Sequence, residues 1–216
     1  MSITDLESPS FPVRMRSAVS FAWSLFSRKV GGNLIPVNKE ASMQLQFAYL
    51  LQQILPLITF HADEKLTLEL ETGVRVGSST REVDIMLTGI AGVTRHKLAI
   101  ELKCYRKITA TGGNRGATDI FMKDVYHDLQ LLEQYVECSH ADEGVMLVMS
   151  DLNQFVTPKS KTKKCWTYDI SDGARFGPVF LNTPIGGKPV SIVLKKNYRF
   201  EWLHYGDFWF LEAQGT

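Results

Sequence analysis

Residues 81–107 read REVDIMLTGIAGVTRHKLAIELKCYRK, and they predict two strands joined by a glycine-containing turn. Asp84 lies in the first strand, and Glu101 and Lys103 lie two positions apart in the second. Since side chains two apart on a strand point to the same face, Glu101 and Lys103 are expected side by side. The apolar face of the first strand is expected to carry Val83, Ile85 and Leu87. A hairpin with one solvated face has the same pattern, so this stretch alone does not distinguish a site from a surface.

Two helices are predicted before these strands. The first covers about 13–30, and the second covers about 38–55 or begins at Pro36. The apolar stripe of the second helix consists of Met43, Phe47, Leu50, Leu51 and Ile54. Glu40 falls on this stripe, where a carboxylate is costly unless it is paired or binds a metal. A first-turn carboxylate also suits the helix dipole, so the helix alone leaves both interpretations open.

The segments around and after the hairpin predict the rest of the fold. A strand is expected over 66–76, a helix over 118–137 and a doubly buried strand over 144–150, paired in parallel through a right-handed crossover. Further strands are expected at about 165–170, 190–196, 198–205 and 208–212, where aromatic residues are dense and should fill a sheet core. The prediction is one α/β domain with an N-terminal helix in 1–35, a core in 36–150 and a C-terminal β-rich extension in 151–216.

Composition restricts the class of protein. The chain has 216 residues, 44% of them hydrophobic and 22% charged, which is an ordinary globular balance for one domain. The net charge of +1 neither favours nor excludes a nucleic-acid partner. Three cysteines without CxxC spacing indicate reduced thiols rather than a zinc site or a disulfide framework. The longest apolar run, 18–26, is too short to span a membrane, and no signal-peptide pattern is present. We therefore expect a soluble, cytoplasmic protein that does not associate with a membrane.

The charged faces of the two strands fit the chemistry of phosphodiester cleavage. That reaction needs positive charge on the phosphoryl oxygens and an activated water, which carboxylates holding Mg²⁺ and a nearby lysine can supply. Asp84 and Glu101 are predicted to hold Mg²⁺, with Mn²⁺ able to substitute. Lys103 is expected beside the metal, where it orients or deprotonates the attacking water. Glu40 is expected to bind the same metal through a water or to hold a second ion.

The runs VDIML and AIELKC, together with this order of elements, resemble the PD-(D/E)xK nuclease superfamily. The resemblance covers roughly 38–150 and implies a restriction-endonuclease-like core: helix, three strands, helix and strand, with a mixed sheet flanked by helices. It gives Asp84, Glu101 and Lys103 the roles of the three active-site residues, and Glu40 that of the acidic residue on the first helix. Val83 stands where the family motif has proline, a position at which many members also lack it. The resemblance further implies cleavage that leaves a 5′-phosphate.

Two basic loops are candidates for contacting the phosphates of a nucleic acid. One leaves the second strand and carries Arg106, Lys107 and Arg115; the other carries Lys159, Lys161, Lys163 and Lys164. For the first loop a solvated surface is an equally good interpretation, and for the second it is the more usual one. Lys123 and Asp124 are interpreted as exposed helix positions, and the five histidines show no ligand spacing.

The combined prediction is a Mg²⁺-dependent deoxyribonuclease of the restriction, repair or phage-defence type, acting on double-stranded DNA. Cutting both strands requires two such centres, which a homodimer would provide, although nothing in the sequence itself indicates one. Three alternatives stay open: a nuclease directed at RNA, an inactive nucleic-acid-binding protein of the same fold, and an interaction module that uses the aromatic C-terminal strands.

Overall fold

The computed structural model describes residues 3–108 and 112–216. The first two-thirds of the chain forms the elements that were predicted, in the predicted order. They are α1 (Phe11–Gly31), α2 (Glu40–Ile54), β1 (Glu64–Val76), β2 (Ser79–Ala91), β3 (Thr94–Tyr105), α3 (Thr118–Glu137) and β4 (Glu143–Ser150). Two short 3-10 helices, η1 (Ile3–Glu7) and η2 (Leu55–Ile58), flank the first two α-helices.

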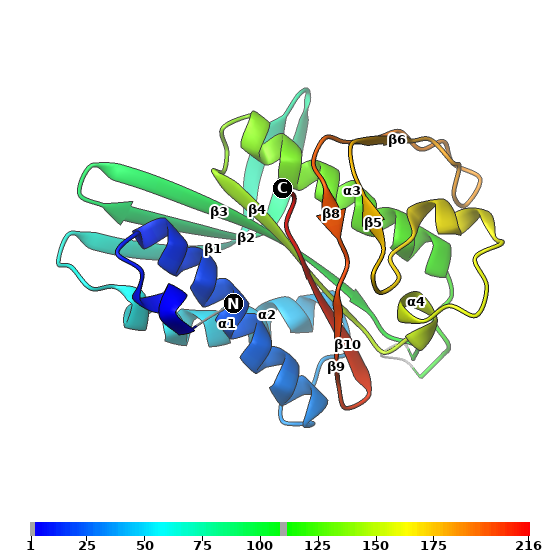
Figure 1. Cartoon of the computed structure of the whole chain (residues 1–216), viewed down its shortest axis with the longest axis horizontal. Helices are drawn as coiled ribbons and strands as arrows, with labels where there is room; N and C mark the ends of the chain where they lie inside the picture. Colours follow the sequence, from blue (N-terminus) through cyan, green and yellow to red (C-terminus); the bar gives the residue numbers. More distant parts are fainter. Residues whose placement is uncertain (1–2, 109–111) are drawn as a thin grey trace.

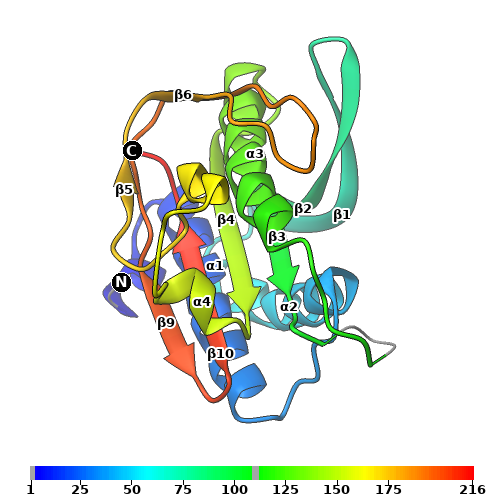
Figure 2. The same cartoon turned by 90° about the vertical axis from the view of Figure 1, so that its right-hand side faces the viewer.

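The main sheet has six strands in the order β1-β2-β3-β4-β10-β9, where β9 is Trp202–Tyr205 and β10 is Phe208–Ala213. β3 and β4 pair in parallel, as predicted, and the other neighbours are antiparallel. Helices α1 and α2 lie against one face of the sheet and α3 lies against the other (Figure 1 and Figure 2). The protein is therefore an α/β fold with a mixed sheet between two helical layers.

The central strands are buried on both faces because both are covered by helices. Ile100 and Leu102 of β3 pack in the α1/α2 layer, and Ala99 packs in the α3 layer. β4 divides in the same way, with Leu147 towards α1 and α2 and Val148 towards α3. Charged side chains on the α3-facing side of β3 therefore lie inside the molecule.

The start of α2 determines where Glu40 lies. The hydroxyl of Ser42 accepts hydrogen bonds from the backbone N–H groups of Asn38 and Lys39 at 3.1 and 3.2 Å. These bonds satisfy two donors at the entrance to the helix and fix Glu40 as its first residue. Pro56, two residues after the helix ends, prevents its continuation.

The C-terminal third differs from the prediction in two elements. The strand predicted at 165–170 is wrong, since residues 164–168 form the 3-10 helix η3 (Lys164–Tyr168). This turn places the Tyr168 ring against Tyr126 of α3, with ring centroids 5.7 Å apart, and a buried aromatic anchor outweighs local strand preference. The strand predicted at 198–205 is split into β8 (Tyr198–Arg199) and β9. The backbone leaves the strand there because Trp202 N–H donates to the Asp172 carboxylate at 2.9 Å.

The remaining C-terminal elements are small. They are α4 (Asn153–Val156), β5 (Arg175–Phe176), β6 (Val179–Leu181) and β7 (Ile192–Leu194). β5 pairs with β8 and β6 with β7, which makes two separate two-stranded sheets. Only these small sheets form an extension, because β9 and β10 complete the main sheet beside β4.

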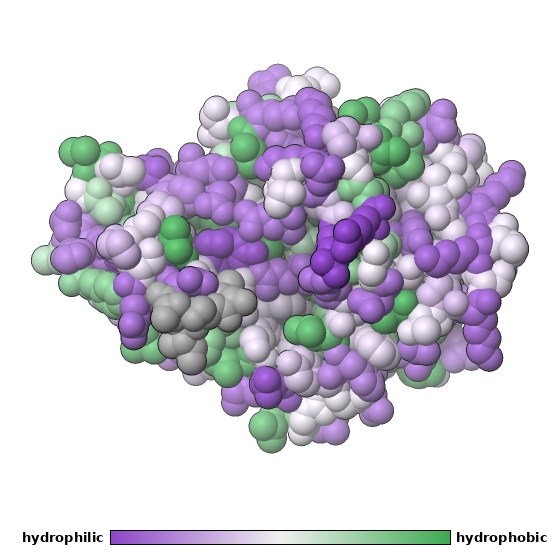
Figure 3. Space-filling model, viewed as in Figure 1, coloured by the Kyte–Doolittle hydropathy of each residue, from purple (hydrophilic) through white to green (hydrophobic). Residues whose placement is uncertain are grey.

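Most of the aromatic residues in 198–210 fill the interior, as predicted. The buried ones are Tyr198, Phe200, Trp202, Phe208 and Phe210, while Tyr205 and Trp209 are partly buried. On the face seen in Figure 3, hydrophilic residues predominate and hydrophobic residues form small, separated patches. None of the helices in residues 3–108 and 112–216 combines the length and the apolar character that crossing a membrane requires.

Candidate active site

The candidate site lies where β2 separates from β3. The antiparallel ladder between these strands begins at the pair Ala91–Thr94 and ends at the pair Ile85–Ile100. On the other side of β2, the register with β1 passes from Leu70–Ile85 directly to Thr72–Val83. Regular pairing is therefore interrupted on both sides of Asp84. We call this point the fork; it comprises Asp84 of β2 and residues 101–104 of β3.

The backbone groups exposed by the fork are bonded to side chains. Leu102 N–H donates to Oδ2 of Asp84 at 2.6 Å, and Cys104 N–H donates to Oε2 of Glu40 at 3.1 Å. The carbonyl oxygen of Asp84 accepts a hydrogen bond from Nε2 of Gln44 at 2.8 Å. Buried backbone donors and acceptors must be paired, and here two carboxylates and one amide take the place of a neighbouring strand. The fork thus draws Asp84 and Glu40 to the edge of β3.

The side chains of Glu101 and Lys103 project from β3 into the layer beneath α3. Glu101 is 5% exposed, and its Oε1 accepts a hydrogen bond from the Tyr135 hydroxyl at 3.0 Å. The ammonium of Lys103 lies 2.8 Å from Oδ2 of Asp128 and 3.5 Å from Oε1 of Glu40. The structure therefore brings the four predicted site residues together and adds Asp128 and Tyr135 from α3. The Glu40 side chain is 42% exposed, so it lies at the rim and not on an inward stripe as predicted.

Two carboxyl groups of the site, on Asp84 and Glu101, have a raised pKa. Burial, followed by the nearby carboxylates of Glu40 and Asp128, raises the pKa of Asp84 to about 6, although the hydrogen bond from Leu102 N–H opposes the rise. Burial, Asp128 and Asp84 raise the pKa of Glu101 well above its usual range. The fold thus keeps these carboxylates close together although they repel one another. This arrangement favours binding of a cation.

Lys103 is the cation that the structure itself supplies. Burial would lower the pKa of Lys103, but the carboxylates of Asp128 and Glu40 outweigh it and raise the pKa above its ordinary value. A charged ammonium can orient a water or stabilise a developing negative charge, whereas it cannot accept a proton. Of the two roles predicted for Lys103, this arrangement suits orientation rather than deprotonation.

The donors at the fork fit a divalent metal of the magnesium type. Mg²⁺ prefers carboxylate oxygens, usually takes only one or two from the protein, and keeps several waters. Asp84 and Glu101 provide such a pair, and a divalent charge would offset the nearby negative charges that, after burial, raise both pKa values. Within the described part of the chain, no group of three or more His, Cys, Asp or Glu residues is already placed to hold an ion. The fit therefore rests on two carboxylates.

Sequence reasoning missed Asp128, Tyr135 and Gln44. The signal for Asp128 was present, because it lies three residues after Val125 and four before Leu132 on the apolar stripe of α3. A carboxylate on such a stripe carries the same implication that was drawn for Glu40. Gln44 has no comparable signal, since a polar residue one turn after Glu40 is ordinary on a helix surface.

One expectation for β2 is also corrected. Val83 was predicted to share the apolar face of Ile85 and Leu87, but it packs in the α3 layer while they pack in the α1/α2 layer. Strict alternation holds only along an unbroken ladder, and the ladder is interrupted at Asp84 between them.

The basic residues after β3 are divided between the fold and the surface. Arg106 forms an ion pair with Asp151 at 3.0 Å, and Arg115 donates to the carbonyl of Cys104 at 3.1 Å. Both are tied to backbone or side chains near the end of β3, while Lys107 beside them is exposed. Residues 109–111 of this loop lie outside the described residues.

The second basic loop lies beside α4 and away from the fork. Lys161 forms an ion pair with Asp169 at 2.6 Å, which ties that side chain to the fold. Lys159, Lys163 and Lys164 are exposed. Lys123 pairs with its neighbour Asp124 on α3.

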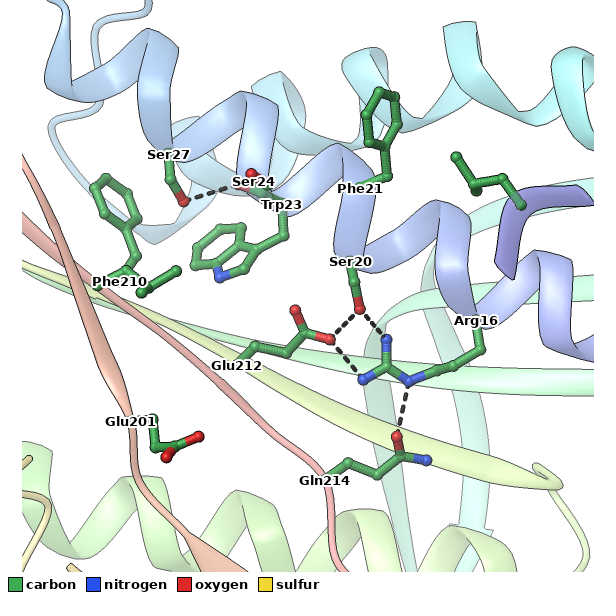
Figure 4. Close-up of a pocket in the computed structure, with 12 residues that line it drawn as sticks. Arg16, Ser20, Phe21, Trp23, Ser24, Ser27, Glu201, Phe210, Glu212 and Gln214 are labelled. Atoms are coloured by element: carbon green, nitrogen blue, oxygen red, sulfur yellow. Dashed lines mark hydrogen bonds and ion pairs between the residues drawn. The ribbon is translucent and has the colours of Figure 1, made fainter. Parts of the chain in front are cut away.

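A cavity of about 590 Å³ lies between α1 and strands β9 and β10, apart from the fork (Figure 4). Arg16 of α1 donates to Ser20 at 2.6 Å, to Glu212 at 2.5 Å and to Gln214 at 2.8 Å. Arg16 and Glu212, which line this cavity, are thus already paired with each other (Figure 4). The network joins α1 to the last strand, and we assign this cavity no role in the chemistry.

No protein-family model, curated protein or solved structure matches this chain.

Proposed function

We propose that this protein is a Mg²⁺-dependent nuclease of the PD-(D/E)xK type that hydrolyses phosphodiester bonds in DNA. The observation that carries the proposal is the fork, where Asp84, Glu101 and Lys103 meet at the edge of β3. The order helix, three strands, helix and strand supports a restriction-endonuclease-like core. The choice of DNA and of a 5′-phosphate product follows from the family resemblance alone.

Asp84 and Glu101 are the residues that would hold the metal, with Glu40 at the rim. When bound, Mg²⁺ supplies positive charge that neutralises phosphoryl oxygens and makes water more acidic. The Leu102 N–H bond holds one oxygen of Asp84 in place, and the Tyr135 hydroxyl does the same for Glu101. Both carboxylates are therefore fixed by the protein before a ligand arrives, which lowers the cost of organising the site.

Lys103 has the role of a charged donor. Asp128 holds its ammonium at 2.8 Å, close to the two carboxylates. From this place it can orient the attacking water by donating a hydrogen bond, and it can stabilise negative charge on the phosphoryl group as the bond breaks. Its stem crosses a buried layer, which restricts the positions the ammonium can take.

The polynucleotide is proposed to enter along the end of β3. Lys107 is exposed just past the end of β3, four residues after Lys103. We propose that it contacts phosphates outside the cleavage position. We propose the exposed residues Lys159, Lys163 and Lys164 as a more distant backbone contact, and a homodimer for cutting both strands.

The decisive experiment is cleavage of plasmid DNA in Mg²⁺ by wild type, Asp84→Asn and Lys103→Met. Each substitution should reduce cleavage at least about 100-fold, as expected when a charge that stabilises the transition state is removed. Glu82→Gln and Lys65→Met are the matched controls, because both positions are exposed on β2 and β1. They should cleave as wild type does.

Retained cleavage in both site variants would overturn the assignment. Linear duplex, single-stranded DNA and RNA, tested alongside, separate the DNA-directed from the RNA-directed enzyme. Binding without cutting in Mg²⁺ and in Mn²⁺ would favour the inactive binding protein. The interaction module is disfavoured because most aromatic residues of 198–210 are buried, and Tyr205 and Trp209 are only partly exposed.

A further inference from the structure

The side-chain amide of Gln44 joins the β2 side of the fork to β1. Its Nε2 donates to the carbonyl oxygen of Asp84 at 2.8 Å and to Oε1 of Glu71 at 2.5 Å. Both partners are acceptors, so the amide orientation follows from the contacts themselves. Gln44 lies one turn after Glu40, which places both side chains on one side of α2. One helix thus holds the fork at two points, through Cys104 N–H and through the Asp84 carbonyl.

Glu71 has an unusual backbone in the middle of a strand. Its φ is +52°, in the left-handed region that favours glycine, although β1 runs regularly on either side. It stands opposite Asp84, where the register passes from Leu70–Ile85 to Thr72–Val83. A non-glycine residue keeps such a conformation only when its surroundings hold it there. The hydrogen bond from Gln44 is a contact of that kind.

The ladder shows what the chain would do without this restraint. The pairs between β2 and β3 follow a constant register, and the next pair after Ile85–Ile100 would be Asp84–Glu101. If β2 continued along that register, the Asp84 carboxylate would leave the N–H of Leu102. The distorted backbone at Glu71 and the amide of Gln44 act against that closure.

We propose that Gln44 and Glu71 are positioning residues that keep the fork open and hold the Asp84 carboxylate beside Glu101. The inference deepens the proposed function and rests on it for its catalytic consequence. Neither residue needs to touch the metal or the substrate. They act through the backbone of Asp84, whose carbonyl is held by Gln44 and whose carboxylate is held by Leu102 N–H.

The first test compares Gln44→Met with Gln53→Met on the same helix. Methionine keeps the length of the side chain but cannot donate a hydrogen bond, and Gln53 is exposed and serves as the matched control. For plasmid cleavage in Mg²⁺, Gln44→Met should lower kcat about 10- to 100-fold, the range for a displaced site group. KM for DNA should stay within about twofold, because an interaction that acts only through Asp84 does not bind the substrate. Gln53→Met should match wild type in both.

A second measurement does not depend on cleavage. Amide hydrogen exchange of Leu102, followed by NMR in metal-free buffer, reports whether Asp84 still accepts its hydrogen bond. Gln44→Met should exchange this amide at least about tenfold faster, while the amide of Leu98 inside the ladder stays protected. Gln53→Met should leave both amides unchanged.

Two substitutions of Glu71 separate its backbone from its carboxylate. Glu71→Gly adopts the positive φ without strain, and it should retain cleavage within about fivefold of wild type. Glu71→Val disfavours that φ, and it should lose cleavage to the same extent as Gln44→Met. Glycine is the better-tolerated change only if the backbone conformation of residue 71, and not its carboxylate, carries the role.

The outcomes are distinguishable. If wild type cuts DNA and Gln44→Met has wild-type kcat and wild-type exchange at Leu102, the positioning role is wrong and the nuclease assignment stands. If wild type does not cut any nucleic acid in Mg²⁺ or Mn²⁺, the proposed function is wrong. The exchange of Leu102 in Gln44→Met then still decides whether Gln44 holds the fork open.

Discussion

Replacing Asp84 by asparagine should make the metal-free protein more stable at neutral pH while abolishing cleavage. Asparagine keeps an oxygen that can accept the hydrogen bond from Leu102 N–H, and it removes the negative charge. The pKa of Asp84 rises from 3.8 to about 6, chiefly because the carboxyl is buried and then because Glu40 and Asp128 lie near it. Each unit corresponds to about 1.4 kcal/mol, so the ionised Asp84 costs the fold about 3 kcal/mol as an upper value.

The pH dependence gives the sign of the effect. The pKa of Asp84 is higher in the folded than in the unfolded state, so the folded state binds more protons between these two values. Stability contributed by this group is fully present below about pH 4 and is lost as the pH rises through about 6. The asparagine variant does not lose stability in this way, because residue 84 then has no carboxyl group to ionise. The two proteins should therefore differ little at pH 4 and by up to about 3 kcal/mol at pH 8.

Urea denaturation in EDTA at pH 4, 6 and 8 measures the difference, with Glu82→Gln as the exposed control. Mg²⁺ at about 1,000 times its Kd should then reverse the order, because it adds about 4.1 kcal/mol to a protein that binds it, which exceeds the difference of about 3 kcal/mol. Wild type should gain this stability and Asp84→Asn should not. If wild type and Asp84→Asn have equal free energies of unfolding at pH 8 in EDTA, the claim that ionised Asp84 destabilises the metal-free fold is refuted.

Three other substitutions test neighbouring parts of the structure. Tyr135→Phe removes the hydrogen bond that lowers the pKa of Glu101, so the acid limb of the pH–rate profile should move to higher pH. Urea denaturation of this variant should show a free energy of unfolding lower by about 1.5 kcal/mol. Asp128→Asn removes the ion partner of Lys103 and should lower the pKa of the ammonium; cleavage assays should show a lower kcat with little change in KM. Arg14→Met breaks a buried ion pair remote from the fork and should cost about 3 kcal/mol in urea denaturation, with cleavage by the folded fraction unchanged.

The elements that sequence reasoning found are those with long, regular patterns. α3 was expected over 118–137 because its apolar stripe is continuous, and the structure has it at Thr118–Glu137. The parallel pairing of β3 with β4 followed from a strand, a long helix and a buried strand in succession. Glu101 and Lys103 share a face because the period of a strand is two residues. These are local rules, and they held wherever the backbone was regular.

The fork could not be predicted in the same way. Its formation requires a left-handed glutamate, Glu71, and propensity rules give no reason to expect positive φ at that residue type. The position of Val83 was missed for the same reason, since alternation was assumed to continue through Asp84. Tyr168 shows a different failure, because its contact with α3 lies more than forty residues away in sequence and outweighs the local strand signal.

The charges at the fork explain why a divalent cation suits this site. Four carboxylates, on Glu40, Asp84, Glu101 and Asp128, lie around one ammonium, on Lys103. With every group ionised, one positive charge offsets one of four negative charges, and two of the carboxylates respond with a raised pKa. A divalent ion would offset two more and leave one negative charge unbalanced. Bringing these acids together therefore destabilises the metal-free fold. Metal binding relieves this repulsion, and the relief contributes to the free energy of binding.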